Sequence, residues 1–560
     1  MINMRKIAII TLLSLLLPIC VALAQENKRV EVTTIYRPEV ASAKKLLAPT
    51  TITDTPSLDV EVEYDIKPET WSIELQDDNF KAATATFWDY NRSRRGYMKL
   101  SAGAPLGSDF QLRYATQNSR VGYFGVNLCH DGEFTPQDNS QGVVRPISQS
   151  YDMRNGLALF GGAYIGRQMF EASLNADYDI YNRYAELTEI PTRQHFGRSG
   201  VTLRYGDDFS NMKRVNFAVE LHSDYWMYVP AILSEVQNSV GEYNLGAAVK
   251  VGRDFGENGV GINLGYDMWG GNANLERKDM RFNVGVDYDR TFGIFDLAVG
   301  LEYMYDKVAG RERGSHFVLP HLKMLVDLKK AAFAPYLEFD SNVSYNGAAS
   351  LYASNPYLDY GLMANSFVSL PNTLNYELTV GFTGVLDQSR FSYRAYVGGR
   401  YIQNELFWYV PTPGVFAAST ANDMRLVLGA ELQYRPVSGL LIGAGIHYRY
   451  DKSESEYVVS EPNFMADAIV EYTIKKFKFY VMSDIFGCRE WSDLSRESGV
   501  FATPVKVDLH AGVSFVANSK CEIFVDGYNL LNRTGATAIY DYAYYYRNGI
   551  GCMAGVKLSF

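Results

Sequence analysis

The chain has 560 residues, a formal net charge of −10 and an aromatic content of 14%, with 41 Tyr, 30 Phe and 47 Gly. No basic stretch interrupts this acidic balance, which argues against nucleic-acid binding, because phosphate backbones are bound by clustered Lys and Arg. Abundant Tyr and Gly at a slightly negative mean hydropathy are unusual for a soluble enzyme. They are typical of transmembrane β-barrels, in which only alternate residues meet lipid.

Residues 1–24 have the pattern of a secretory signal peptide. Arg5 and Lys6 precede an apolar run at residues 7–17, and Ala22 and Ala24 form a small-x-small cleavage motif. A lipoprotein signal at Cys20 fits less well, because a bulky isoleucine stands where a small residue is expected. We therefore expect an exported protein.

Residues 25–90 form the next predicted segment. They contain several Pro and many Thr and Lys with little sustained periodicity, which indicates an extended lead-in. We expect this segment to lie in the periplasm or to thread into a lumen. After residue 24 no run of about 18 apolar residues follows, so spanning helices are excluded.

Residues 91–560 alternate between apolar and polar residues in runs of 9–13. In residues 424–434 and 440–450 the even-numbered positions are almost all apolar, which predicts a hairpin with an apolar outer face and a polar inner face. Tyr434 and Tyr450 end these runs where aromatic girdles are expected. The charged or ionisable side chains predicted to face the lumen are Arg425, Glu431, His447, Arg449 and Lys557.

The connections between the runs alternate between short and long. The short turns are 117–120, 166–168, 206–213, 253–258, 290–293, 328–331, 387–390, 436–439, 475–478 and 517–520. The long loops are 129–150, 180–195, 225–239, 268–277, 345–372, 404–422, 452–463, 487–503 and 532–549. This rhythm predicts an all-β fold, a transmembrane antiparallel barrel of about 22 strands with its short turns in the periplasm. A soluble sandwich or propeller is the alternative that strand spacing alone leaves open.

The last strand ends on an aromatic residue. Val556, Leu558 and Phe560 share its apolar face with Cys552 and Ala554. An alternating final strand with a C-terminal aromatic resembles the signal that the barrel assembly machinery recognises. We therefore expect Val556, Leu558 and Phe560 to act as the assembly signal.

The stretch "CEIFVDGYNLLNRTG" (521–535) is similar to the C-terminal end of TonB-dependent outer-membrane receptors, in which an Asn-Leu-x-Asn turn precedes a loop and a closing aromatic strand. Residues 529–532 carry that match, and residues 354–362 and 374–382 resemble receptor-type barrels of Bacteroidetes. The resemblance covers the barrel and implies solute uptake across the outer membrane. The implied partners are outer-membrane lipid, the barrel assembly machinery, and TonB or an outer-membrane partner protein. Residues 25–90 are about half as long as the family's globular plug.

The sequence predicts no enzyme, no cofactor and no metal site. No histidine lies in a HExxH or Cys/His cluster, no GxSxG elbow is present, and the spacing of Cys129, Cys488, Cys521 and Cys552 fits no zinc or redox motif. Ser315 beside His316 is expected to be a chance neighbour rather than a lipase dyad.

Aromatic side chains cluster in two predicted loops, 404–414 and 538–549. They are Phe407, Trp408, Tyr409, Tyr544, Tyr545 and Tyr546. Exposed aromatic rings suit stacking on a sugar or a flat ligand, and an extended girdle is the equally weighted alternative.

Three functions compete on this sequence. The first is a barrel of the TonB-dependent-receptor type that takes up or admits a solute. The second is a non-transport barrel subunit of an envelope complex, a scaffold or assembly component, suggested by the short lead-in. The third and most remote is a barrel lipid hydrolase.

Overall fold

The computed structural model describes residues 95–104, 106–116, 121–134, 152–182, 193–229, 239–272, 277–328, 333–359, 370–386, 390–532 and 549–560. The predicted signal peptide and lead-in lie outside these residues. Their boundaries with the barrel therefore remain predictions.

The described residues form one sheet, antiparallel except where β15 meets β20, with a single short helix, α3 (Ala348–Ser354). The first half of the sheet contains β1 (Gly96–Ala104), β2 (Gly107–Ala115), β3 (Gly122–Glu133), β4 (Asp152–Ile165), β5 (Gln168–Asn182), β6 (Arg193–Gly206), β7 (Asn216–Val229), β8 (Val240–Phe255), β9 (Asn258–Gly271), β10 (Lys278–Phe292), β11 (Phe295–Lys307) and β12 (Ser315–Val326). The second half contains β13 (Ala334–Ser344), β14 (Thr373–Leu386), β15 (Phe391–Thr412), β16 (Val415–Tyr434), β17 (Leu440–Ser453), β18 (Phe464–Ile474), β19 (Phe477–Phe486), β20 (Arg489–Asp493), β21 (Val500–Thr503), β22 (Lys506–Asn518), β23 (Cys521–Tyr528) and β24 (Gly551–Ser559).

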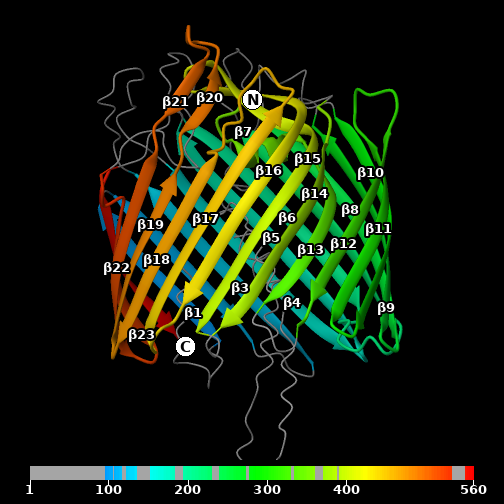
Figure 1. The fold of residues 1–560 in the computed structure, drawn as a ribbon, viewed down its shortest axis with the longest axis horizontal. Coiled ribbons are helices and arrows are strands. Elements are labelled where there is room, and N and C mark those ends of the chain that lie inside the picture. The colour runs from blue at the N-terminus through cyan, green and yellow to red at the C-terminus, as the bar shows by residue number, and fades with distance from the viewer. Residues whose placement is uncertain are drawn as a thin grey trace, which may run out of the picture. The chain divides into compact units, whose positions relative to one another are not determined.

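The sheet closes on itself to form a barrel (Figure 1). Each wall strand pairs with its neighbours in chain order, β19 pairs with β22, and β1 closes the ring by pairing with β24. Of the 24 strands described, β20 and β21 form a hairpin within the β19–β22 connection, which leaves 24 − 2 = 22 in the wall. The prediction of an all-β barrel of about 22 strands is confirmed.

The two ends of the barrel differ as the sequence predicts. At the short-turn end, which also holds the C-terminus, two-residue turns place Gly166, Gly256 and Gly293 at φ between 64° and 71°, a conformation that glycine adopts without a Cβ clash (Figure 1). The long-loop end carries the β20–β21 hairpin and α3. Two links between described wall strands at that end have only two residues, the β1–β2 link and the β15–β16 link.

The outer face of the wall carries a band of apolar side chains. In the predicted hairpin, Leu426, Leu428 and Leu432 of β16 and Ile446 and Tyr448 of β17 are exposed, as expected for the lipid-facing side. Residues of the same kind follow around the ring, for example at the exposed positions Leu221, Leu264, Leu301, Val380 and Val481. In a closed ladder the main-chain polar groups bond within the wall, which is what allows strands to stand in lipid. Among the described residues, no helix is both long and apolar enough to cross a bilayer.

Three predicted loops instead contain regular structure. Residues 404–422 belong to β15 and β16, which run for 22 and 20 residues, well above the ends of their neighbours. They continue because a bulge between Ile402 and Glu405, with Asn404 at φ 58°, turns the hairpin without breaking its pairing. Residues 487–503 form the β20–β21 hairpin, and residues 345–372 include α3.

Phe560 completes the closure of the ring. Its N–H donates to the carbonyl oxygen of Gly96 (2.9 Å), and the N–H of Gly96 donates to the carbonyl oxygen of Phe560 (2.8 Å). Its ring occupies the space in which a side chain at Gly96 would stand. An aromatic ring over a glycine in the adjacent strand fixes the register of the closing pair.

Deleting Phe560 is therefore expected to lower the yield of folded barrel in the outer membrane without affecting export. Gly96→Val is expected to do the same, because its Cβ would overlap the Phe560 ring. Heat-modifiable migration of the membrane fraction on electrophoresis measures the yield. Phe477→Ala, which removes another exposed aromatic at the short-turn end, is the control. An undiminished heat-modifiable band in the Phe560 deletion would contradict this role.

Candidate functional site: a cap over the long-loop end

Three segments at the long-loop end pack together, and we call them the cap. They are residues 345–359 with α3, the β15–β16 tip at residues 405–418, and the β20–β21 hairpin. Leu358 forms a parallel bridge with Phe416, and β20 pairs in parallel with the upper part of β15. The three segments are therefore joined by main-chain hydrogen bonds as well as by side chains.

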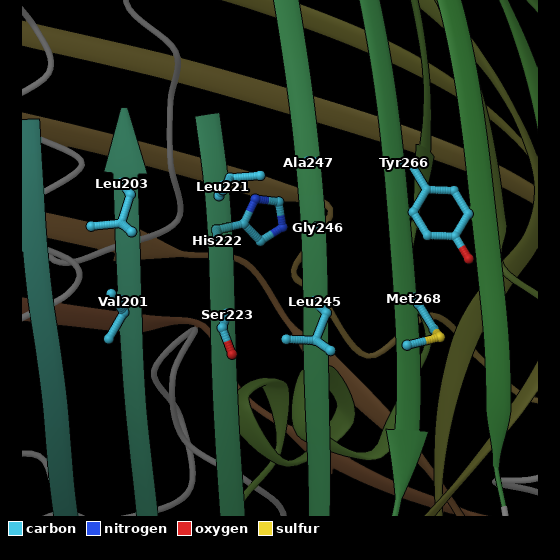
Figure 2. A pocket seen from close by; sticks show the side chains of 10 residues that line it. All are labelled: Val201, Leu203, Leu221, His222, Ser223, Leu245, Gly246, Ala247, Tyr266 and Met268. Carbon is cyan, nitrogen blue, oxygen red and sulfur yellow. The ribbon is translucent and has the colours of Figure 1, made fainter. Parts of the chain in front are cut away.

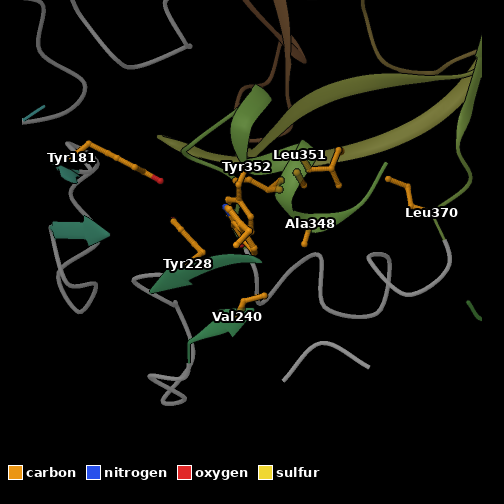
Figure 3. Close-up of a cluster of buried hydrophobic side chains, with 11 residues drawn as sticks. Tyr181, Tyr228, Val240, Ala348, Leu351, Tyr352 and Leu370 are labelled. Carbon is orange, nitrogen blue, oxygen red and sulfur yellow. The ribbon is translucent and has the colours of Figure 1, made fainter. Parts of the chain in front are cut away.

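Stacked aromatic rings fasten α3 to the opposite wall (Figure 3). The Tyr352 ring lies 4.0 Å from that of Tyr228 and 5.4 Å from that of Trp226, both on β7. The Tyr181 hydroxyl of β5 donates to the carbonyl oxygen of Pro356 (2.8 Å). Because α3 belongs to the β13–β14 connection, this contact carries the cap over to strands six or more positions away in the ring.

The core of this contact is apolar and fully buried. Its members are Tyr181, Trp226, Tyr228, Val240, Ala348, Leu351, Tyr352, Leu358, Leu370, Ala417 and Ala418. Burial of large aromatic side chains stabilises such a contact by several kcal/mol, on the order of 3–5 for each ring that would be lost by truncation to Ala. The cap is thus packed like a domain core.

Polar contacts fasten the start of the cap. Arg277 donates to the carbonyl oxygen of Asn346 (3.1 Å) and pairs with Asp279, and the N–H of Ala348 donates to Glu242 Oε2 (2.9 Å). Burial alone lowers the pKa of Arg277, but the neighbouring acidic groups outweigh it and hold that pKa above its usual value. Arg277 therefore stays charged, and it links Asp279 of β10 to the start of the cap at Asn346.

The lumen beneath the cap is lined with ion pairs, and Arg425 is the centre of one network. The Arg425 side chain is buried, and Arg449 of β17 shares one of its partners, Asp451, at 2.8 Å. The acidic partners of Arg425 are Glu405 (3.4 Å), Asp423 (3.3 Å) and Asp451 (2.7 Å). Both arginines lie below the β15–β16 tip. Their charges are neutralised within the wall because these carboxylates pair with them.

The other residues predicted to face the lumen lie on the inner face too. Lys557 pairs with Glu522 (3.2 Å) near the short-turn end, and His447 lies 3.1 Å from the Tyr396 hydroxyl. Glu431 stands directly across from an arginine of β15. These inward side chains are thus polar and have polar or oppositely charged neighbours.

The predicted loop aromatics stand elsewhere. Phe407, Trp408 and Tyr409 lie in β15, not in a loop, because pairing with small residues of β16 continues past the bulge. Phe407 is 2% exposed, Trp408 packs against the cap core and Tyr409 stacks on Tyr457 at 4.4 Å. These rings hold the cap together, and the prediction of exposed stacking rings at 404–414 is wrong. Tyr544, Tyr545 and Tyr546 lie outside the described residues.

The predicted assembly signal lies on the closing strand. Val556 stands opposite Leu100 of β1, and Leu558 opposite Met98. Phe560 is 54% exposed on the same outer face. Recognition of these side chains by the barrel assembly machinery remains a prediction.

The geometry gives no support to a hydrolase. Ser315 and His316 are consecutive in β12, so their side chains leave opposite faces, and His316 bonds the Tyr303 hydroxyl (2.7 Å). In the part of the chain that the structure describes, no group of three or more His, Cys, Asp or Glu side chains is arranged to hold a metal. Cys488, Cys521 and Cys552 are free thiols.

A shallow pocket lies on the outer wall (Figure 2). The exposed side chains Val201, Leu203, Leu221 and Leu245 surround the small Ser223 on β6 to β8. It faces the apolar band, and its lining is almost entirely apolar. We therefore assign it no ligand.

A closed wall of 22 strands with an apolar outer face and a polar lumen defines a transmembrane β-barrel of the large kind. No protein-family model matches the chain, and no curated protein sequence is similar to it. The fold does have relatives among solved structures, and the alignments cover 84% of this chain.

Three of these structures represent the similarity. The copper transporter OprC has 12% identity and a TM-score of 0.64, with 81% of its chain covered. The FrpB iron transporter from Neisseria meningitidis (F3-3 variant) has 10% identity and a TM-score of 0.65, with 82% covered. The ferric-catecholate import receptor Fiu from E. coli K12 has 9% identity and a TM-score of 0.59, with 82% covered. The protein therefore has the barrel fold of TonB-dependent receptors, and the predicted resemblance is confirmed for the fold.

Sequence reasoning missed the residues that anchor the cap. Trp226 and Tyr228 lie on the inner face of β7, where the alternation predicts polar side chains. Two large aromatic rings on an otherwise polar face could have indicated that another segment of the chain packs against the inside of the wall there. The partner, Tyr352, has no such signal, because its position follows only from the three-dimensional path of the β13–β14 connection.

Tyr352→Ala is expected to loosen the cap, because it leaves the rings of Trp226 and Tyr228 without their partner. Limited proteolysis of the barrel in lipid should then cut within residues 345–359, with the wall intact. Tyr450→Ala, which removes an exposed ring from the outer face of β17, should leave those residues as protected as in the unmodified protein. Equal protection in all three proteins would contradict the packing described for the cap.

Proposed function

We propose that the protein resides in the outer membrane, with its short turns in the periplasm, and provides a route for a solute through its lumen. The observation that carries this proposal is the combination of a polar, ion-paired lumen with a cap over the long-loop end. A wall of 22 strands encloses more space than its own side chains fill. A lumen of that width needs a closure if it is not a constant leak.

The solved structures of the same fold support transport. They include a copper transporter, an iron transporter and a ferric-catecholate import receptor. Their ligands are not carried over to this chain, since the similarity is one of fold. The proposal is accordingly a non-enzymatic barrel for an unspecified solute, with lipid and the barrel assembly machinery as its partners, and TonB as the partner if uptake is driven by energy.

The cap serves as the outer closure in this proposal. It is joined to two separate arcs of the wall, at β5–β10 through aromatic and polar contacts and at β15–β16 through the main chain. In this proposal, breaking the contacts at either arc lets the cap move away from the long-loop end and opens the lumen. Residues 25–90, expected either in the periplasm or threaded into the lumen, are the second candidate for an obstruction.

Single-channel conductance in a planar bilayer tests the proposal. Four proteins are compared: the mature chain, the chain without residues 25–90, mature Tyr352→Ala, and Tyr352→Ala without residues 25–90. Tyr450→Ala is the matched control. We expect the mature chain and the control to be silent and the protein with both changes to conduct.

Each pattern has a distinct meaning. Openings in Tyr352→Ala alone assign the closure to the cap, and openings that also need the truncation assign part of it to residues 25–90. Large steady openings of the unmodified mature chain would contradict closure by the cap. Silence of the doubly changed protein would contradict solute passage and would favour the non-transport envelope subunit.

A further inference from the structure

The wall of the barrel has a seam between β12 and β13. These strands pair only from Leu322 opposite Phe339 to Leu325 opposite Tyr336. The flanking pairs β11–β12 and β13–β14 are bonded along nearly their whole length. Above Leu322 and Phe339, toward the long-loop end, β12 and β13 run on without a ladder between them.

At the seam the wall overlaps itself instead of ending edge to edge. Leu374 of β14 shares its outward face with the exposed Leu378 and Val380, yet it is 4% exposed. Val343 of β13 stands opposite Leu374 and is likewise buried. The burial of two outward-facing residues requires another part of the wall to cover them.

The covering residues come from the inner face of the neighbouring strands. Leu319 alternates with Val318, which is 55% exposed on the outside, so Leu319 points inward. Met304 alternates in the same way with the exposed Tyr303 of β11. Met304, Leu319, Val343 and Leu374 pack into one cluster, with Phe317 and Tyr376 against it. The upper parts of β13 and β14 therefore lie on the lumenal side of β12.

Side-chain hydroxyls replace the missing main-chain hydrogen bonds. The Ser341 hydroxyl donates to the carbonyl oxygen of Pro320 (2.8 Å), and the Tyr376 hydroxyl donates to that of Val318 (3.1 Å). Pro320 has no N–H to offer to a partner strand. Two hydroxyl contacts and an apolar cluster can separate at far lower cost than a ladder of main-chain bonds in lipid.

The seam leads from the apolar outer band to the polar lumen. Its outer edge is marked by Val318 and Tyr303, and its middle by the apolar cluster. At its inner, lower end stand a hydrogen bond between His321 and Asp340 and an ion pair between Lys323 and Glu338, each at 2.6 Å. From the outside to the lumen, the seam is thus first apolar and then polar. An amphiphile with a hydrocarbon chain and a polar head group has the same order of properties.

We propose that the seam is a lateral portal that admits the acyl chain of an amphiphile between β12 and β13, with its head group at the lumenal polar groups of His321, Asp340, Lys323 and Glu338. The upper ends of β13 and β14 act as the moving edge. They are held closed by Arg281, which donates to the carbonyl oxygen of Val343 (3.1 Å), and by Asn372, which donates to Asp306 (2.6 Å). The β13–β14 connection also carries α3, so the portal and the cap share one element. The portal does not depend on solute passage along the barrel axis.

Photolabelling of the full-length mature protein in lipid bilayers tests the portal. One arm uses a fatty acid with a diazirine in its chain, and the other a phospholipid with the same group. The tryptic peptide of residues 314–323 contains lipid-facing Val318 and the inward-facing Phe317 and Leu319. Tandem mass spectrometry assigns the label to a residue within it. We expect label on Phe317 or Leu319 in at least one arm, and the labelled arm identifies the source of the acyl chain.

A reversible lock provides the matched comparison. Leu319→Cys with Val343→Cys, oxidised to a disulfide, joins the two edges across the seam, and the cross-linked peptides verify the bond. Met324→Cys with Leu337→Cys, which stand opposite each other in the paired part below the seam, locks that part in the same way and leaves the charged side chains in place. We expect inward labelling at Phe317 to be lost in the oxidised seam lock, restored on reduction, and unchanged in the lower lock.

Two results would overturn the portal. One is label confined to outward-facing residues such as Val318 in every protein and both arms. The other is inward label that persists in the oxidised seam lock. Heat-modifiable migration shows that each variant is folded, and if the seam lock fails to fold, the position of the label in the unmodified protein decides the question alone.

Discussion

A strand wall in lipid is stable only if its main-chain polar groups find partners within the wall, and everything else in this molecule follows from how that requirement is met. The ladder runs through 22 strands and closes where β24 meets β1, with Phe560 lying over Gly96. Closure at this strand number sets a lumen that side chains leave open. The inner face carries polar side chains, and several of its charges are paired, as Lys557 is with Glu522.

The wall departs from this rule in one region, and the departure and the cap belong together. The upper ends of β13 and β14 leave the ladder with β12 and turn to the lumenal side, where apolar contacts and hydroxyl groups replace main-chain bonds. The connection between them can then reach across the lumen to Trp226 and Tyr228. If β13 paired with β12 along its whole length, the β13–β14 connection would begin at the rim of the barrel. Because the pairing stops early, the connection begins inside the barrel.

Much of the fold was accessible from the sequence because alternation with period two is a local property. The outward side chains of β16 and β17 and the positions of the short turns all follow from it. The cap was not accessible, since Phe407 and Trp408 look like loop aromatics until β15 is seen to continue past its bulge. The overlap at Leu319 and Val343 was equally hidden, because a residue buried by overlap and one facing lipid have the same apolar character. Pairing between strands far apart in the chain decides such features, and no local pattern encodes it.

The most direct test of this account is hydrogen–deuterium exchange of the unmodified mature barrel in lipid, followed at residues 346–359. The account predicts slow exchange at Ala348, Leu351 and Asn355, whose N–H groups donate to Glu242, Gly347 and Leu351 within a packed cap. Exchange of these amides as fast as in an exposed peptide, while the wall strands stay protected, would contradict a packed cap and leave the lumen open at its long-loop end.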